Sequence, residues 1–235
     1  MPDENIDTAR LPVLAVLGGT GKEGKGLAYR WAKAGYRVLI GSRQAEKAQA
    51  AAQEISILFS EHVDLRGLSN VEAAEQADIL VLTVPYSAHT STLEGIKQAA
   101  QGKLLVDVTV PLNLGRVTKV SLPPAGSAAQ EARQILGEGV EVVDAFQNIS
   151  HEHLLSEVGV DCDVLVCGTS KAARQEVLKL VKAAGFTGWD AGPIENCAVV
   201  EGLTSLLIYI NRQYGGGAAG IRITGVPQNG TGGEG

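Results

Sequence analysis

The chain has 235 residues, of which 45% are hydrophobic and 20% charged, so it is long enough to bury the core of one large or two small globular domains. Its net charge of −6, its pI near 5.3 and the lack of any Lys and Arg cluster argue against nucleic acid as a partner. The longest apolar run, 198–210, is too short to span a bilayer and contains Glu201, so we expect no membrane segment.

The first ten residues are acidic and polar, and they lack the basic and apolar regions of a secretory signal. We expect residues 1–10 to be an N-terminal tail of a cytoplasmic protein.

The cysteines Cys162, Cys167 and Cys197 are an odd set without CxxC spacing, which is typical of buried thiols in a reducing compartment. The sequence therefore predicts neither a disulfide framework nor a metal site.

Short segments rich in Val, Ile and Leu, apolar on both faces, predict buried parallel strands. They are 13–17, 37–40, 79–84, 104–110 and 140–145, with a weaker strand at 63–65. Helices are expected between them at 22–34, where Gly35 is a natural C-terminal cap, at 46–55 and at 71–76. This alternation predicts an α/β fold with a doubly wound, mostly parallel sheet, forming a Rossmann domain over residues 11–146.

After Phe146 the alternation becomes less regular. A strand at 164–167 precedes a helix at 171–184, the sequence GWDAGP and an apolar helix near 195–214. We expect a smaller, mainly helical C-terminal domain over 147–225. The stretch GGGAAG at 215–220 predicts a flexible joint within it, and residues 226–235 predict a disordered tail.

The segment 16–26, VLGGTGKEGKG, fits two phosphate-binding patterns. A nucleoside-triphosphate P-loop would need Ser or Thr after Lys25 to bind magnesium, and that position is Gly26. The dinucleotide pattern GxGxxG, which begins at Gly19, needs a strand before it and a helix after it, and both are expected here. We therefore predict that a dinucleotide pyrophosphate binds at the N-terminus of the first helix.

The second strand ends in LIGSRQ, and no acidic residue lies between Tyr36 and Gln44. An NAD site would place Asp or Glu there for the ribose hydroxyls. Ser42 and Arg43 offer instead a hydroxyl and a guanidinium suited to a 2′-phosphate. The sequence predicts NADP(H) as the cofactor.

Two further strands end alike, in TVP at 83–85 and at 109–111. Ligands of such sheets bind at the carboxyl ends of the strands. We expect Val84, Tyr86 and Val110 to line the nicotinamide side of the crevice.

Familiar catalytic constellations are missing from the sequence. The single Tyr-x-x-x-Lys, from Tyr29 to Lys33, falls within the first helix, far from a nicotinamide, and G-x-S-x-G and HExxH do not occur. An alcohol dehydrogenase needs a placed acid or base, whereas hydride transfer between two bound cofactors needs mainly proximity. We therefore assign no catalytic side chain.

The segments LGGTGKEGKGLA, GSRQAEKA, ADILVLTVPY and DAGPIENCAVVEGLTSLL together resemble the NADPH-dependent reductases of coenzyme F420, an 8-hydroxy-5-deazaflavin. The likeness runs in order from about Val13 to Ile223. It implies an oxidoreductase that passes a hydride between NADP(H) and the deazaflavin as co-substrate. It also implies a homo-oligomer, dimeric or tetrameric, with C-terminal helices at the subunit contacts.

The resemblance assigns individual positions as well. It implies that Gly19, Thr20, Gly21, Lys22 and Glu23 belong to the pyrophosphate-binding region, and that Ser42, Arg43 and Lys47 bind the 2′-phosphate. It further implies that His151 neighbours the nicotinamide and that Ala219 neighbours the deazaflavin.

The chain departs from the family at two places. Gln147-Asn148 stands where relatives often have His-Thr, and His89 is one position away from the usual histidine. Both bear on the second cofactor, so two alternatives stay open: an NADPH-dependent flavin or ferric reductase, as in similar metalloreductase domains, and a noncatalytic NADP(H) sensor.

Overall fold

The computed structural model describes residues 11–113, 115–155 and 161–226. Their strands are β1 Leu14–Leu17, β2 Val38–Ser42, β3 Leu65–Ser69, β4 Ile79–Leu82, β5 Leu104–Asp107, β6 Glu141–Asp144, β7 Asp163–Gly168 and β8 Thr187–Pro193. Their helices are α1 Lys22–Lys33, α2 Ala45–Ser56, α3 Asn70–Gln76, α4 His89–Ile96, α5 Ala128–Leu136, α6 His151–Leu154, α7 Lys171–Ala183 and α8 Cys197–Tyr214, with short 3-10 turns η2 Tyr86–Ala88 and η3 Ile194–Asn196.

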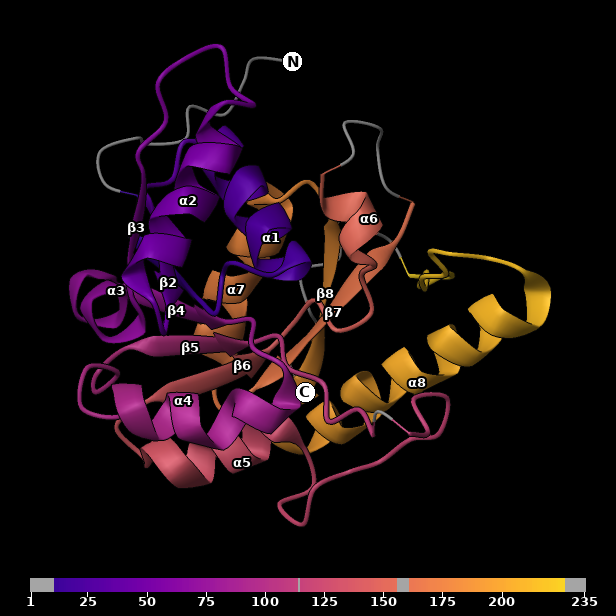
Figure 1. Ribbon diagram of the computed structural model, residues 1–235. Helices are drawn as coiled ribbons and strands as arrows, with labels where there is room; N and C mark the ends of the chain where they lie inside the picture. The colour runs from indigo at the N-terminus through magenta and orange to yellow at the C-terminus, as the bar shows by residue number, and fades with distance from the viewer. Residues whose placement is uncertain (1–10, 114, 156–160, 227–235) are drawn as a thin grey trace.

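All eight strands form one sheet in the order β3-β2-β1-β4-β5-β6-β7-β8 (Figure 1). Neighbouring strands are parallel except for β6 and β7, which pair antiparallel. The chain order turns back between β1 and β4, which lie side by side. In a doubly wound sheet this turning point opens a crevice at the carboxyl ends of the strands, and the predicted α/β Rossmann fold is confirmed.

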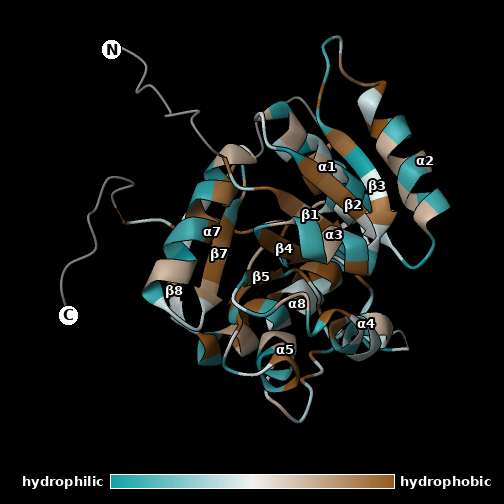
Figure 2. Ribbon diagram, turned by 90° about the vertical axis from the view of Figure 1, so that its left-hand side faces the viewer, coloured by the Kyte–Doolittle hydropathy of each residue, from teal (hydrophilic) through white to brown (hydrophobic). Residues whose placement is uncertain are grey.

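Two apolar layers sandwich the sheet. Residues of α1, α2 and α7 bury one of its faces, and residues of α3, α4, α5 and the start of α8 bury the other. Strands β1 and β4 are buried at every position, which explains their uninterrupted apolar sequences. Figure 2 shows these strands as the hydrophobic centre between helices of mixed polarity.

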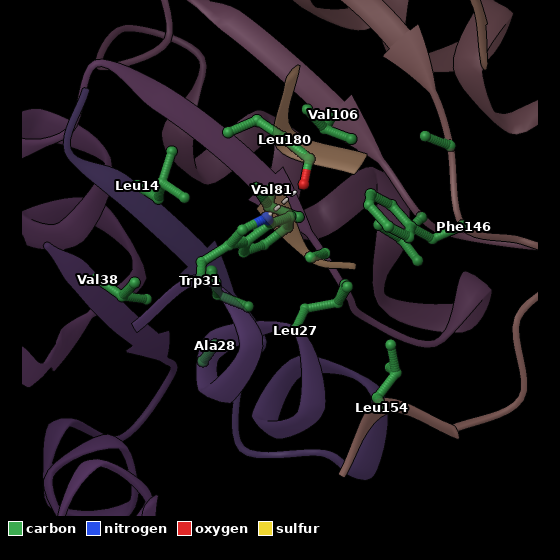
Figure 3. Close-up of a cluster of buried hydrophobic side chains, with 14 of the residues drawn as sticks. Leu14, Leu27, Ala28, Trp31, Val38, Val81, Val106, Phe146, Leu154 and Leu180 are labelled. Carbon is green, nitrogen blue, oxygen red and sulfur yellow. Dashed lines mark hydrogen bonds between the residues drawn. The ribbon is translucent and has the colours of Figure 1, made fainter. Parts of the chain in front are cut away.

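Helix α1 anchors the distant α6 and α7. The buried Trp31 indole donates a hydrogen bond to the Leu180 carbonyl of α7, 2.9 Å away (Figure 3). The Arg30 guanidinium donates to the carbonyls of His153, Leu154 and Ala184 at 2.6, 2.8 and 2.7 Å. Gly35 follows α1 with φ +88°, as the sequence predicts for its C-terminal cap. The contacts of Arg30 and Trp31 fix α6 and α7 beside α1.

The C-terminal part of the chain contributes more sheet than the sequence indicates. The segment GWDAGP, for which the sequence predicts no strand, belongs to β8, and β3 begins at Leu65, later than expected. Strands β7 and β8 extend the same sheet, so the domain division at residue 146 stays a prediction.

The tails expected at 1–10 and 226–235 lie outside the described residues, apart from Val226. Among the described helices, none is both long and apolar enough to cross a bilayer.

Candidate cofactor site

The glycines after β1 allow three backbone segments to approach closely. Gly18 has φ +72°, and a Cβ there would lie 2.4 Å from Val84 Cγ1. A Cβ on Gly19 would lie 2.7 Å from the Val16 carbonyl oxygen, and one on Gly24 would lie 2.6 Å from Gly19 Cα. The sequence therefore needs glycine at these positions to turn the chain from β1 into α1.

The N-terminus of α1 is open to a ligand. Gly21 is its N-cap and provides no side-chain cap, so the first-turn N–H groups of the helix remain available. A Cβ on Gly21 would meet only the Gly18 carbonyl oxygen, 4.0 Å away. This arrangement fits a pyrophosphate, which binds where helix N–H groups and the helix dipole converge.

Gly26 has a structural role at the position where a P-loop would carry Ser or Thr. A Cβ added there would lie 2.4 Å from Leu154 Cβ, because α6 packs directly on this turn of α1. Because Gly26 has no side chain, α6 can pack close to the cofactor loop.

A cleft of about 880 Å³ runs along the carboxyl ends of β1, β2, β4 and β5. Arg43 and Lys47 line one end, both exposed, and Ser42 beside them is buried. In the part of the chain that the structure describes, neither cation has an ion pair with a carboxylate. Two unpaired cations beside a hydroxyl form a site that fits a phosphate dianion.

The other end of this first cleft is more apolar. Val84 and Val110 line it together with Tyr86, as the sequence predicts, and Val108 lies among them. The Tyr86 hydroxyl donates to Glu131 Oε2 over 2.9 Å, and burial with this hydrogen bond raises the pKa of Tyr86 to about 12. The phenol therefore stays protonated and fixed in position, so its ring forms a wall of the cleft.

A second cleft of about 390 Å³ lies between α1, the end of β6, α6 and α8. His151 and Ala219 both line it. Three buried side-chain oxygens of its lining residues have no hydrogen-bond partner: Glu23 Oε1, Gln147 Oε1 and Asn148 Oδ1. Buried polar atoms are almost always paired, so these three oxygens are available to accept hydrogen bonds from a molecule in this cleft.

The two clefts share a wall. Glu23, Val108, Val110 and Leu112 line both. A nicotinamide at the apolar end of the first cleft would therefore face the contents of the second.

A hydrogen-bonded network of ionisable side chains includes Asp107, the last residue of β5, which directly precedes Val108 of this wall. The His89 ring is fully buried, with Nε2 2.8 Å from Asp107 Oδ2 and Nδ1 3.0 Å from Glu131 Oε1. Burial opposes charge on this imidazole, but the hydrogen bonds and charges of Asp107 and Glu131 raise its pKa overall. His89 lines neither cleft, so its shifted position in the sequence places it in a structural network.

Glu201 and Asp190 also have structural partners. Glu201 accepts hydrogen bonds from the Ala128 and Ala129 N–H groups at 2.8 and 3.1 Å, which joins α8 to the first turn of α5. Burial nevertheless raises the pKa of Glu201 to about 8. Asp190 accepts from Gly192 N at 3.0 Å and pairs with Arg174, so it stabilises the bulge within β8 where the pairing with β7 shifts register.

One cluster of possible metal ligands occurs among the described residues: Asp144, Cys167 and Cys197, all buried. The hydrogen bond from Cys167 and burial raise the pKa of the Cys197 thiol, and burial raises that of Asp144. The cluster lines neither cleft. The three cysteines are free and buried, as the sequence predicts.

The structure brings most of the predicted site residues together. Twelve line one or both clefts, whereas Gly19 lies buried behind the loop. Sequence reasoning missed Asn70, whose Oδ1 accepts from Gly18 N over 3.2 Å and which lines the first cleft. Its signal was a polar residue directly after a strand, next to the Ser69–Glu72 capping box. It also missed the α8 residues of the second cleft, Thr204, Leu207, Ile208 and Asn211.

Comparison with known proteins identifies the relatives of this chain. The family model described as NADP oxidoreductase, coenzyme F420-dependent, matches residues 13–111. The F420-dependent NADP reductase of Methanothermobacter marburgensis is 43% identical over 92% of this chain and 99% of its own length. That of Methanocaldococcus jannaschii is 38% identical over 90% of this chain and 97% of its own length.

A solved structure agrees with these sequences. The crystal structure of a putative F420-dependent NADP reductase from Arthrobacter sp. FB24 superposes with a TM-score of 0.78 at 25% identity, covering 91% of this chain and 100% of that one. These matches cover nearly the whole length of this chain and of each relative, so the matched regions are not confined to the nucleotide loop. The chain therefore belongs to the family of F420-dependent NADP reductases.

Proposed function

We propose that this protein transfers a hydride between NADP(H) and the deazaflavin coenzyme F420. The observation that carries the proposal is the wall shared by the two clefts, formed by Glu23, Val108, Val110 and Leu112. Two separate bound molecules can meet there, which is what direct transfer between two cofactors requires. The curated relatives named F420-dependent NADP reductases support the same chemistry.

In this proposal the first cleft binds the nucleotide. Thr20, Gly21, Lys22 and Glu23 surround the pyrophosphate with their backbone, while the Glu23 side chain belongs to the wall shared by the two clefts. Gly19 is buried behind their loop. Ser42, Arg43 and Lys47 hold the 2′-phosphate, and Val84, Tyr86 and Val110 shape the nicotinamide end. NADPH supplies the hydride when it is bound; the protein orients it and excludes water.

The second cleft binds the deazaflavin in this proposal. His151 stands on α6 and Ala219 follows α8, and both line this cleft. The Asn211 side chain of α8 accepts a hydrogen bond from Ala219 N over 3.0 Å, and the His153 ring lies 3.1 Å from the Ala218 carbonyl oxygen. These contacts hold the glycine-rich segment against the cleft, so it forms part of the wall.

The function is tested by mixing the purified protein with NADPH and one acceptor at a time, and following the loss of NADPH absorbance. We expect rapid oxidation with the deazaflavin, and oxidation at least about 100-fold slower with free flavin or a ferric chelate. Faster reaction with flavin or iron would assign the protein to the metalloreductase-like alternative. Tight NADPH binding without turnover on any acceptor would make it a sensor.

We further propose that the protein is a homo-oligomer that pairs through α8. Figure 1 shows this helix extending from the body of the sheet. Val199, Leu206, Tyr209 and Ile210 lie at helical spacing on one of its faces and are 69, 50, 54 and 44% exposed. An apolar helix face of this extent is typical of a subunit interface.

Tyr209→Glu should convert the oligomer into monomers, because it places a charge within the apolar interface. Light scattering coupled to size-exclusion chromatography measures the mass. Ile57→Glu is the matched control, since Ile57 is 80% exposed at the end of α2, away from this face, and the mass should not change. A wild-type protein of monomeric mass would contradict the proposal.

A further inference from the structure

Glu23 is the one carboxyl group among the described residues that line either cleft, and it lines both. It stands in the first turn of α1, one turn before Gly26, so it shares the helix face that packs on α6. An acid group here faces the place where the nicotinamide and the second cofactor would meet.

The environment of Glu23 favours its protonated form. The residue is partly exposed as a whole, but its Oε1 atom is buried and accepts no hydrogen bond. Burial raises the pKa of this carboxyl from 4.5 to about 8. The other titratable groups that line the clefts are Lys22, Arg43, Lys47 and Tyr86 in the first and His151 in the second. Glu23 therefore holds a proton at neutral pH, where an ordinary glutamate would be ionised.

The proposed reaction needs such a proton. Reduction of a deazaflavin by NADPH adds a hydride to a ring carbon and a proton to a ring nitrogen, and NADPH supplies only the hydride. We propose that Glu23 holds and delivers this proton, an inference that rests on the proposed function.

The step balances as follows. The C–H bond of the dihydronicotinamide breaks, and its hydrogen leaves with both electrons to form a C–H bond on the acceptor. The O–H bond of Glu23 breaks, its proton goes to the acceptor nitrogen, and the carboxylate later takes a proton from water. In the reverse direction Glu23 receives the proton. The acceptor thus gains one hydride from the dihydronicotinamide and one proton from Glu23.

The charge of the nicotinamide links the two movements. Loss of the hydride leaves a cationic ring at the apolar end of the first cleft, and a nearby positive charge favours the carboxylate form of Glu23. The acid therefore holds its proton beside NADPH and releases it more readily once NADP⁺ has formed.

This link is measurable without any deazaflavin. Titration calorimetry of NADPH and of NADP⁺, each in buffers of different ionisation enthalpy at pH 8, gives the protons exchanged on binding. We expect the wild-type protein to bind NADP⁺ with about 0.3 proton fewer per site, or a larger deficit, than NADPH. Both nucleotides carry the same 2′-phosphate, whose titration cancels in the comparison.

Glu23→Gln should abolish the difference, because the amide has no acid proton and nearly the same shape. Glu94→Gln, a change of the same charge on the exposed face of α4, should leave it intact. Thermal melting of each variant verifies that it is folded. Equal proton counts for the two nucleotides in the wild-type protein, or a difference that persists in Glu23→Gln, would overturn the proposal.

Turnover provides a separate readout. With deazaflavin and NADPH, the wild-type rate of hydride transfer should fall as pH rises through about 8, because Glu23 loses its proton there. In Glu23→Gln the rate should be about 100-fold lower and independent of pH over this range. A normal proton count with no deazaflavin reduction would overturn the proposed function and not the proton-holding role of Glu23. Normal reduction with no proton difference would overturn that role alone.

Discussion

Gly24→Ala is expected to destabilise the protein and to weaken NADPH binding at least about tenfold. A Cβ at Gly24 would lie 2.6 Å from Gly19 Cα and 2.7 Å from Thr83 Oγ1. Gly19 on one side is backbone, and the Thr83 hydroxyl on the other side is held by the hydrogen bond that it donates to the Leu17 carbonyl oxygen over 3.0 Å. Overpacking of this kind costs about 1–3 kcal/mol, more than the gain of up to about 1 kcal/mol from alanine in a helix.

The melting temperature should therefore fall by several degrees, and the loop that approaches the pyrophosphate should shift. Calorimetric melting and NADPH titration measure the two effects. Gly95→Ala is the matched control, because Gly95 lies in α4 with nothing within 4 Å of its added Cβ, and it should melt slightly higher than the wild type. If Gly24→Ala behaved like Gly95→Ala, the close contact between α1 and β1 would not be needed for binding.

Arg43→Ala should lower the affinity for NADPH about 10- to 100-fold and leave the affinity for NADH nearly unchanged. A charge-assisted hydrogen bond contributes about 1.5–3 kcal/mol, and each 1.4 kcal/mol is a factor of ten. Arg43 lines the end of the first cleft and, among the described residues, pairs with no carboxylate, so a 2′-phosphate is the partner it lacks. Lys47 and Ser42 would retain part of the preference.

Fluorescence titration with both nucleotides tests this selectivity. Arg66→Ala removes the same charge from β3, where Arg66 is exposed and pairs with Asp64 outside the cleft, and it should affect neither nucleotide. Equal losses for NADPH and NADH in Arg43→Ala would show that Arg43 does not read the 2′-phosphate.

The central strands could be predicted from the sequence, whereas of the two edge strands β3 was predicted only weakly and β8 was not predicted. Strands β1, β2 and β4 are buried on both faces, so burial itself requires the apolar runs that reveal them. Strands β3 and β8 end the sheet, each with one neighbour, and most of their residues are partly exposed. Without full burial their sequences contain polar residues, glycine and proline, and the apolar pattern disappears.

The nucleotide-binding residues could also be predicted from local sequence. Their loop directly follows β1, and the Ser42–Arg43 pair lies at the end of β2, so a local motif is enough to find them. The second cleft gathers residues from 147–151, 204–211 and 217–219, brought together by the packing of α6 on Gly26 and by Asn211 holding the segment after α8. No local pattern encodes such contacts, and for this reason His151 and Ala219 were identified through resemblance to relatives alone.

The continuous sheet limits how this molecule can be divided. Strand β6 pairs with β5 on one side and with β7 on the other. A chain ending after β6 would leave an apolar strand with unpaired N–H and C=O groups, the kind of edge to which other chains attach and aggregate. An engineered fusion that borrows the nucleotide-binding half must therefore include β7, or it must replace the shielding that β7 gives.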